Sequence, residues 1–442
     1  MSGAPPDFES RTPDWLSYED ALARVLAAAR TGPTERVPLD RADGRALAED
    51  LHASATLPPW DNSAMDGYAV RADDVGGASS ATPVSLRVVG SVRAGAPPAG
   101  RVEPGQAVRI MTGAPLPPGA DSVVRVEDTD GEAGQDGRVV VLLDRDAGRN
   151  VRPGGEDMEV GDRVLVAGST VHAGTVGVLA ALGVTEVPVV RRPVVAILAT
   201  GDELRPPERY DEVRAGAGIP ESNGPMLAAA VRAAGGEPRL LPVAPDEPDA
   251  LRSRLAEARA SDVLVTIGGA SMGEADLVKR VLDDLGFDLS FWRATIRPGS
   301  PVSFGFLPAG PGPDATPLPV FGLPGNPSSA FVTFEIFVRP FLRRAGGHGA
   351  CLRRRVRCVA EERLSAPAGL TYFLRVEVRD GPAGVPLVRP AGPQGSGLVS
   401  GLGRAHGLAV VGPEAEGVEP GQEVDVILLD GGTEAEPPSH VR

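Results

Sequence analysis

Residues 263–285 read VLVTIGGASMGEADLVKRVLDDL, and this stretch decides the fold. Its first five residues form a short apolar run that predicts a buried strand, and residues 276–285 carry apolar side chains at helical spacing. Gly268 and Gly269 join the two elements. A strand that leads through a glycine turn into a helix is the unit from which α/β domains with parallel sheets are built.

The same alternation extends to both sides of this unit, from residue 192 to residue 347. Strands are expected at 194–198, 239–243 and 320–323, and helices at 225–234, 249–260 and 328–342. Asn223 is placed to cap the helix at 225–234, and Gly235-Gly236 to end it. Because the strands are apolar throughout, we expect a parallel-core sheet that helices cover on both faces.

The flanking regions have a different pattern. Helices are expected at 18–30, 41–51 and 175–182. Short valine-rich runs between glycine and proline turns predict a β-domain, with strands at 84–92, 107–111, 122–127 and 138–143. A second β-domain is expected after residue 347, with strands at 353–361, 372–379, 408–411 and 423–429.

The composition argues against several classes of function. The 442-residue chain has a net charge of −15 and lacks the basic stripe that is typical of nucleic-acid-binding proteins. It has no apolar run long enough to span a membrane, and its first 14 residues do not resemble a signal peptide. Cys351 and Cys358 match neither a zinc site nor a redox pair. We therefore expect a cytoplasmic protein with no nucleic-acid partner and no membrane association.

Three polar loops follow strands of the predicted sheet, at residues 200–203, 268–276 and 324–329. Ligands of open parallel sheets bind beyond the carboxyl ends of the strands, so we expect these loops to meet at one edge. Gly268-Gly269 lets a ligand approach the backbone, and the next helix N-terminus attracts anions. The carboxylates in these loops favour a divalent cation that bridges to a phosphate.

Each of these features also has a purely structural interpretation. The glycine pair suits a tight turn with Asp276 as a helix cap, and Asp202-Glu203 suits a polar turn. Arg293 and Arg297, four residues apart, could clamp an oxyanion or neutralise nearby acids. No Gly-x-Gly-x-x-Gly or Walker A pattern follows the strands, which argues against dinucleotide or ordinary P-loop chemistry.

Taken together, these segments resemble the molybdopterin molybdenumtransferase family, which includes the E domain of gephyrin. The resemblance runs from about residue 15 to residue 429. It rests on six stretches in the same order: LPPWDNSAMDGYAV at 57–70, residues 150–157, ATGDEL at 199–204, residues 222–224, residues 268–276 and residues 322–328.

The resemblance implies a multi-domain fold of α/β and β parts. An elongated linker domain would consist of residues 14–57 and 150–191, with an inserted β-domain at 58–149. A molybdopterin-binding-like α/β domain would cover 192–347, and a C-terminal β-barrel 348–430, with flexible tails at 1–13 and 431–442. Members of the family form elongated homodimers with the site in a cleft shared between subunits.

The resemblance also implies a reaction. Molybdenum from molybdate would enter adenylylated molybdopterin with release of AMP, assisted by Mg²⁺ or another divalent cation. Partners would be a molybdopterin adenylyltransferase and the molybdoenzymes that receive the cofactor. The implied catalytic positions are Asp61, Thr112, Glu203, Arg293 and Arg297, and the cation ligands are Asp246, Asp276 and Glu203. The implied substrate-binding positions are Arg152, Asp157, Gly268, Gly269, Ser271, Pro324, Asn326, Pro327, Arg375 and Ser396.

The basic strip departs from the lysines that are usual in the family. Arg293 and Arg297 keep the charge but not the shape of two of them, and Ser300 loses the charge of the third. Two alternatives to the enzyme therefore stay open. One is a non-catalytic paralogue that acts as a molybdopterin-binding carrier or assembly partner. The other is an adenylyltransferase, although adenylylating relatives prefer Gly-Gly-Thr-Gly where this chain has residues 268–271.

Overall fold

The computed structural model describes residues 15–97, 100–131, 137–268, 275–310 and 316–429. The chain divides into two compact units. The first unit contains residues 1–49, 167–176 and 186–442, and the second contains residues 50–166 and 177–185. The division into four domains that the sequence suggests stays a prediction.

The first unit is built on a six-stranded sheet in the order β15-β12-β16-β20-β19-β17. The first four strands run parallel: β15 (Glu237–Leu240), β12 (Val194–Ala199), β16 (Val263–Ile267) and β20 (Leu318–Leu323). They confirm the predicted parallel core. Two further strands, β19 (Ser303–Leu307) and β17 (Asp288–Trp292), were not expected from the sequence; β19 pairs antiparallel with β20, and β17 pairs antiparallel with β19 and forms the edge.

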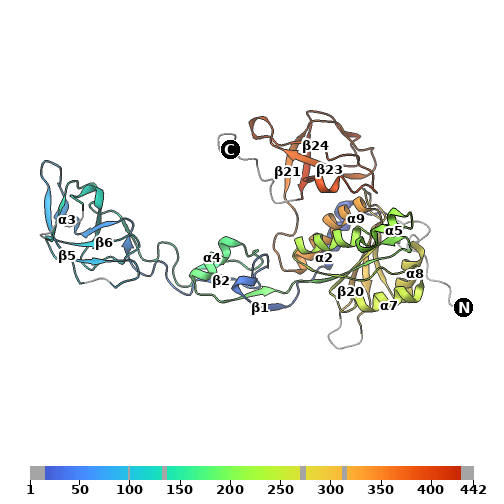
Figure 1. The fold of residues 1–442 in the computed structure, drawn as a ribbon, viewed down its shortest axis with the longest axis horizontal. Helices are drawn as coiled ribbons and strands as arrows, with labels where there is room; N and C mark the ends of the chain where they lie inside the picture. The colour runs from blue at the N-terminus through green and yellow to red at the C-terminus, as the bar shows by residue number, and fades with distance from the viewer. Residues whose placement is uncertain (1–14, 98–99, 132–136, 269–274, 311–315, 430–442) are drawn as a thin grey trace. The chain divides into compact units, whose positions relative to one another are not determined.

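Helices cover both faces of this sheet, as predicted (Figure 1). One face packs against α2 (Tyr18–Ala28), α6 (Asn223–Ala233) and a continuous helical run formed by α9 (Pro327–Thr333), η4 (Phe334–Val338) and α10 (Arg339–Ala345). The other face packs against α7 (Pro248–Ala258) and α8 (Ala275–Asp284). In the described part of the chain, no helix combines the length and apolar character needed to cross a membrane.

The helix expected at residues 41–51 is not formed. A 3₁₀ turn, η1 (Leu39–Arg41), leads into a segment whose backbone bonds to distant residues instead. The amide of Leu47 donates to the carbonyl of Ser169 (3.0 Å), and that of Ala48 to the carbonyl of Pro188 (3.0 Å). This tertiary pairing replaces the bonds of a helix while it still buries the apolar side chains, so helical spacing alone was misleading here.

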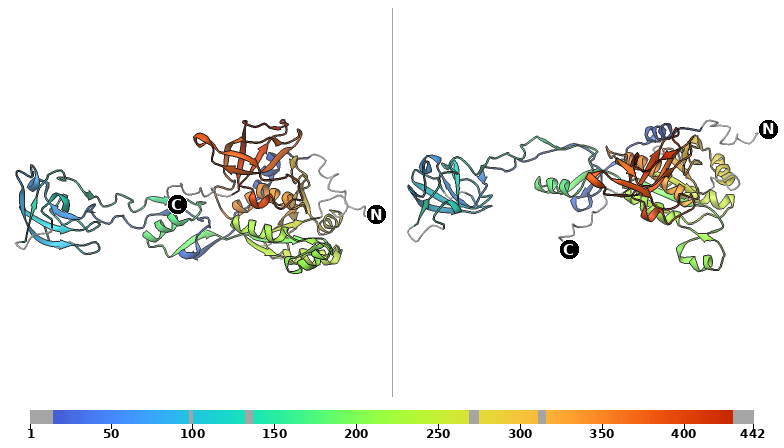
Figure 2. Two further views of the ribbon diagram at one scale, coloured as in Figure 1. Left: turned by 45° about the horizontal axis from the view of Figure 1, so that its top comes forward. Right: turned by 90° about the horizontal axis from the view of Figure 1, so that it is seen from above.

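The C-terminal strands of the first unit close into a barrel (Figure 2). The ring consists of β23 (Thr371–Arg379), β24 (Leu387–Pro390), β21 (Arg355–Ala360), β27 (Glu423–Leu428) and β25 (Gly407–Val411), and β25 pairs back to β23. This confirms the predicted β-barrel. A short strand, β18 (Ile296–Arg297), pairs with β23 and joins the barrel to the α/β part.

The second unit contains a five-stranded sheet in the order β7-β4-β6-β5-β8. Four strands match the predicted ones and β4 is additional: β5 (Val84–Val92), β6 (Gln106–Ile110), β7 (Ser122–Arg125), β8 (Arg138–Val141) and β4 (Gly67–Val70). Two further segments run antiparallel to each other, because β3 (Asn62–Ser63) pairs with β9 (Val151–Arg152) and Leu57 bridges Met158.

Each unit buries a titratable side chain. In the first unit, burial and then Arg343 and Arg339 lower the pKa of His348 from 6.5 to about 3, and its Nδ1 lies 2.8 Å from the Thr170 hydroxyl. In the second unit, burial raises the pKa of Asp146, but hydrogen bonds from Arg125 outweigh it and lower that pKa from 3.8 to about 2. His348 is thus held neutral and Asp146 ionised.

Candidate functional site

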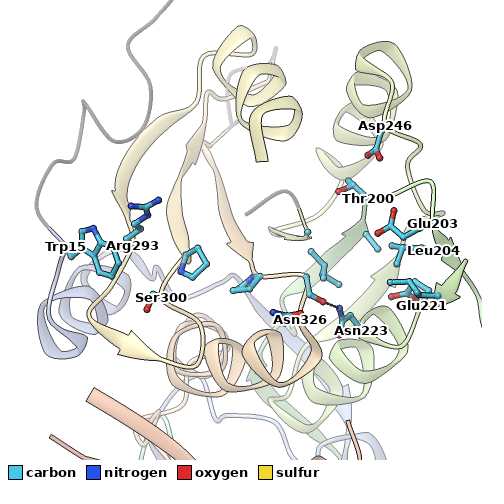
Figure 3. Close-up of a pocket in the computed structure, with 18 residues that line it drawn as sticks. Trp15, Thr200, Glu203, Leu204, Glu221, Asn223, Asp246, Arg293, Ser300 and Asn326 are labelled. Carbon is cyan, nitrogen blue, oxygen red and sulfur yellow. Dashed lines mark hydrogen bonds between the residues drawn. The ribbon is translucent and has the colours of Figure 1, made fainter. Parts of the chain in front are cut away.

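A pocket of about 620 Å³ opens in the first unit at the carboxyl ends of the parallel strands (Figure 3). It is lined by residues 199–201, 203 and 204 at the end of β12, by Ile267 and Gly268 at the end of β16 and by residues 324–326 after β20. The predicted meeting of three loops at one sheet edge is confirmed. It follows from the parallel direction of β12, β16 and β20, which brings their carboxyl ends to a common edge.

One wall of this first pocket is acidic. Figure 3 shows Glu203, Glu221 and Asp246 on the same side. The Glu203 carboxylate folds back over Gly201, where a Cβ atom would lie 2.7 Å from both of its oxygens. Gly201 also has a φ of 141°, so glycine is required there for two reasons. The Asp246 amide donates to Asp202 (3.2 Å), which ties the two acidic loops together.

Glu221 is a pocket residue that sequence reasoning missed. It is 6% exposed, and its Oε1 accepts a hydrogen bond from the Gly224 amide (2.7 Å). Burial raises its pKa, against the lowering effect of the Gly224 and Asn223 amides. The only available signal was its place directly before the Ser222-Asn223-Gly224 stretch.

The loop after β20 is held from two sides. Asn223, expected to be a helix cap, is the first helical residue, and its Nδ2 donates to the Gly325 carbonyl (2.6 Å). From the barrel side, the Ser396 hydroxyl accepts a bond from Asn326 (3.1 Å), and the Ser396 carbonyl accepts one from the Ser328 amide (3.0 Å). These bonds fix the backbone that carries Pro324, Asn326 and Pro327.

Arg375, expected to bind substrate, is instead buried in the structure, with only 1% of it exposed. Its guanidinium donates to the Ser328 hydroxyl, to the Pro393 carbonyl (2.8 Å) and to the Gly395 carbonyl (3.3 Å). Burial lowers its pKa. Arg375 and Ser396 therefore position the loop and do not line the first pocket.

The wall opposite the acids carries Arg293, Trp15 and Ser300 (Figure 3). The Arg293 guanidinium lies 4.1 Å from the ring centre of Trp292 and 5.2 Å from that of Trp15. A planar guanidinium stacks on aromatic faces better than an ammonium does, which gives a physical reason for arginine at this departure from the family. Arg293 also has a left-handed backbone, with a φ of 77°.

The predicted clamp of two arginines is not formed in the first pocket. Arg297 is exposed on β18, where it is paired in register with Tyr372 of the barrel, and it does not line the pocket. Ser300 does line the pocket, and its hydroxyl donates to the Ile296 carbonyl. This wall therefore carries one of the two predicted arginines.

A second pocket, of about 540 Å³, lies in the second unit. It is lined by Pro58, Pro59, Trp60, Asn62, Gly113, Arg152, Glu156 and Asp157. Predicted catalytic residues flank it. Asp61 accepts a bond from the Gly154 amide (2.8 Å), and Thr112 donates its amide (2.6 Å) and hydroxyl (2.7 Å) to Asp66. These Thr112 bonds lower the pKa of Asp66.

The predicted cation ligands are only partly covered by the described residues. Glu203 and Asp246 line the first pocket, and Asp276 is the second residue of α8. Gly269 and Ser271 lie outside the described residues. Among the residues that the structure describes, no three His, Cys, Asp or Glu side chains are grouped closely enough to hold a metal ion by themselves.

Known proteins match the chain along most of its length. Three family models match in order: the MoeA N-terminal region (domain I and II) over residues 16–183, a probable molybdopterin binding domain over residues 196–344, and the MoeA C-terminal region (domain IV) over residues 357–429. The chain is 35% identical to the molybdopterin molybdenumtransferase of Bacillus subtilis (strain 168), over 96% of this chain and 95% of that protein.

Two further relatives agree with this result. Molybdopterin molybdenumtransferase 2 of Mycobacterium tuberculosis (strain H37Rv) is 38% identical over 92% of this chain and 98% of its own length. The crystal structure of the molybdopterin biosynthesis moeA protein from Pyrococcus horikoshii OT3 has a TM-score of 0.79 and 30% identity, and it covers 94% of this chain and 100% of its own.

Proposed function

Because this chain belongs to the molybdopterin molybdenumtransferase family, we propose that it acts in molybdenum cofactor biosynthesis by inserting molybdenum into adenylylated molybdopterin. Molybdate supplies the metal, and AMP is released. The observation that carries the proposal is the first pocket, where an acidic wall faces a fixed arginine at the carboxyl edge of the sheet. We infer that it receives the phosphate and oxyanion groups of the substrates.

A divalent cation fits the donors of the first pocket. A phosphate anhydride beside Glu203, Glu221 and Asp246 would meet strong repulsion unless a cation lay between them. Mg²⁺ commonly binds one or two protein carboxylates and completes its shell with water and substrate phosphates, so a full set of protein ligands is not needed. Asp246 and Glu203 would hold it, with Asp276 as a third ligand. When bound, it would polarise the phosphoryl oxygens and stabilise the AMP that leaves.

The chain's own groups account for the remaining tasks in this proposal. Gly268 and Gly325 expose backbone to the substrate, and the bonds from Asn223 and Ser396 hold the Pro324–Pro327 loop in place. Arg293, in cation–π contact with Trp15 and Trp292, keeps a positive charge at a fixed position for the incoming oxyanion.

We extend the proposal to assembly and location. A cytoplasmic homodimer would take its substrate from a molybdopterin adenylyltransferase and pass its product to molybdoenzymes. If the site is shared between copies, Asp246→Asn and Asp157→Asn chains are each inactive alone, and mixing them restores AMP release. Light scattering that shows a monomer, or mixtures that stay inactive, would contradict this part of the proposal.

The test of the reaction is AMP release. Purified protein is incubated with adenylylated molybdopterin, molybdate and Mg²⁺, and AMP is measured by chromatography. We expect release that depends on both molybdate and Mg²⁺ and stops with a chelator. Pterin binding without AMP release under these conditions would instead favour the non-catalytic carrier, for which the replacement of lysine by Ser300 is the one supporting observation.

A further inference from the structure

The second pocket contains an exposed aromatic side chain that the proposed reaction does not use. Trp60 lines this pocket and is 50% exposed, although tryptophan is highly buried on average in folded proteins. Within the described ranges, its indole makes no ring stacking or cation–π contact with another residue. The exposed half of Trp60 can therefore contact a flat partner.

Backbone hydrogen bonds join the segment that carries Trp60 to the facing segment, residues 154–157. The Gly155 amide donates to the Pro58 carbonyl (2.9 Å), and the Asp157 amide donates to the Leu57 carbonyl (3.1 Å). A Cβ atom at Gly154 would lie 3.3 Å from the Trp60 backbone, so the two segments pass very close together. Trp60 is thereby preorganised beside the charged residues of the facing segment.

Those charged residues give the second pocket a specific pattern of donors and acceptors. The carboxylates of Glu156 and Asp157 accept hydrogen bonds, whereas the guanidinium of Arg152 donates them. Two adjacent N–H donors on a ligand match a carboxylate in a two-pronged bond, and carbonyl or ring-nitrogen acceptors match a guanidinium. A flat ring that has two adjacent N–H donors on one edge and acceptors on another would match these side chains.

We propose that the second pocket binds the pterin ring of the substrate, with Trp60 stacked on its face, Asp157 or Glu156 on its 2-amino and N3–H edge, and Arg152 on its 4-oxo side. This inference rests on the proposed function and adds the subsite for one half of the substrate. Stacking of a heterocycle on an aromatic side chain is worth about 1–3 kcal/mol, or roughly 5- to 150-fold in affinity.

The adenine of the same substrate fits this pattern less well. Adenine carries one amino group flanked by ring-nitrogen acceptors, so it cannot give a carboxylate two adjacent N–H donors. The 2-amino-4-oxo edge of a pterin presents those two donors side by side. The donor pattern of the second pocket therefore selects the pterin half over the adenylyl half.

The experiment measures binding of two matched probes to the full-length protein by calorimetry. The probes are 6-hydroxymethylpterin and 6-hydroxymethyllumazine, which carry an amino and an oxo group at position 2, respectively; the oxo compound also has a hydrogen on N1. We expect the pterin to bind about tenfold more tightly, because the oxo group removes one donor and faces a carboxylate. Asp157→Asn together with Glu156→Gln should abolish this preference.

Tryptophan variants test the stacking on Trp60. Trp60→Ala should weaken pterin binding about tenfold, and Trp60→Phe should restore most of it. Trp15→Ala is the matched control, because Trp15 is also exposed (43%) but lines the first pocket, and it should leave pterin affinity unchanged. Circular dichroism of each variant checks its fold, and the solvent exposure of Trp60 makes misfolding of Trp60→Ala unexpected.

Three results would overturn the inference: no pterin binding to the wild-type protein at millimolar concentration, equal binding of pterin and lumazine, or unchanged pterin affinity in Trp60→Ala. Mg²⁺-dependent AMP release by the wild-type protein is measured in parallel. Release without selective pterin binding refutes this subsite alone, whereas selective binding without release refutes the proposed reaction alone.

Discussion

The two pockets of the molecule are built in different ways. The first lies where parallel strands end, so its acids and its arginine are carried by loops anchored in a buried sheet. The second lies between two short antiparallel segments outside the larger sheet of its unit, and its most prominent side chain is an exposed tryptophan. The first suits charge at fixed positions, and the second suits the face and edge of a ring.

Under the proposed assignment, the two pockets recognise two chemically unlike halves of one substrate. Phosphate and metal chemistry requires opposite charges at fixed distances, which strand ends and braced loops provide. Ring recognition requires a flat surface and a short row of donors and acceptors, which two backbone segments can provide. Substitutions that affect one pocket and not the other test whether the two pockets have these different roles.

The largest effect is expected at Asp246. Asp246→Asn removes a charge from the proposed cation site, and AMP release should fall about a hundredfold, because a bound metal contributes several kcal/mol of charge stabilisation. The matched control is Asp249→Asn, three residues further along, where the side chain is 98% exposed. Unchanged AMP release in Asp246→Asn, or an equal loss in the control, would contradict the prediction. Pterin binding should be unaffected in both.

A fall in pH from 7 to 5 should destabilise the first unit more than the second. His348 has a pKa of about 3 in the folded chain and 6.5 ordinarily, so its contribution is complete above pH 6.5 and is lost as the pH falls toward 3. The slope is about 1.4 kcal/mol per pH unit, or about 2 kcal/mol by pH 5. Asp146 has a lowered pKa of about 2, so its contribution persists until the pH falls below about 4.

Calorimetric unfolding at pH 7 and pH 5 checks this difference. His348→Gln keeps a polar group beside Thr170 and should reduce the loss of unfolding free energy between pH 7 and pH 5. Asp146→Asn should leave this loss unchanged. A slope that persists in His348→Gln would mean that other groups cause the acid sensitivity of the first unit.

A smaller effect is expected at Arg375. Arg375→Met leaves the Pro393 and Gly395 carbonyls without their buried donor and should cost between about 1 and 2 kcal/mol in stability. Hydrogen exchange should also rise at residues 324–329, because the loop loses its contact at Ser328. Arg379→Met is the matched control on the same strand, where the side chain is 59% exposed. Equal exchange in both variants would show that Arg375 does not hold the loop.

The smallest effect is expected at Arg293. Arg293→Lys keeps the charge but weakens the stacking on Trp15 and Trp292, a loss of about 1 kcal/mol or less. The KM for molybdate should rise a few-fold, and tryptophan fluorescence should change. Arg297→Lys serves as the control, since Arg297 does not line the pocket. An equal rise in KM for Arg297→Lys would contradict this prediction and support an oxyanion clamp formed by both arginines.

Sequence alone predicted the parts of the molecule that depend on local pattern. Continuous apolar strands and polar loops at their ends were enough to bring Gly201, Gly268 and Gly325 to one edge, because parallel strands leave no other arrangement. Four of the five barrel strands were likewise predicted, whereas β24 (Leu387–Pro390) was missed. The helix at 41–51 failed, since its periodicity could not reveal that distant backbone would pair with Leu47.

The features that sequence missed join residues far apart in the chain. Arg293 meets Trp15 across more than half of the chain, and Arg375 on β23 reaches Ser328 in α9, so no local window contains either contact. Arg375 is buried and bonded to the loop in the structure, and its expected role in substrate binding stays a prediction. In the sequence, Glu221 is an acidic residue before a helix, and nothing in the local pattern indicates that it is buried beside the pocket.

The hydrogen bonds between the barrel and the loop after β20 mean that substitutions in the barrel can affect the first pocket. No described barrel residue lines the first pocket, yet Arg375 and Ser396 set the path of the loop that does. Exchange of barrels between relatives would thus alter substrate preference at a distance. Substitutions on the face of β23 that carries Phe373 and Arg375, which points away from the barrel core, should be counted among those that change activity, although these residues do not line the first pocket.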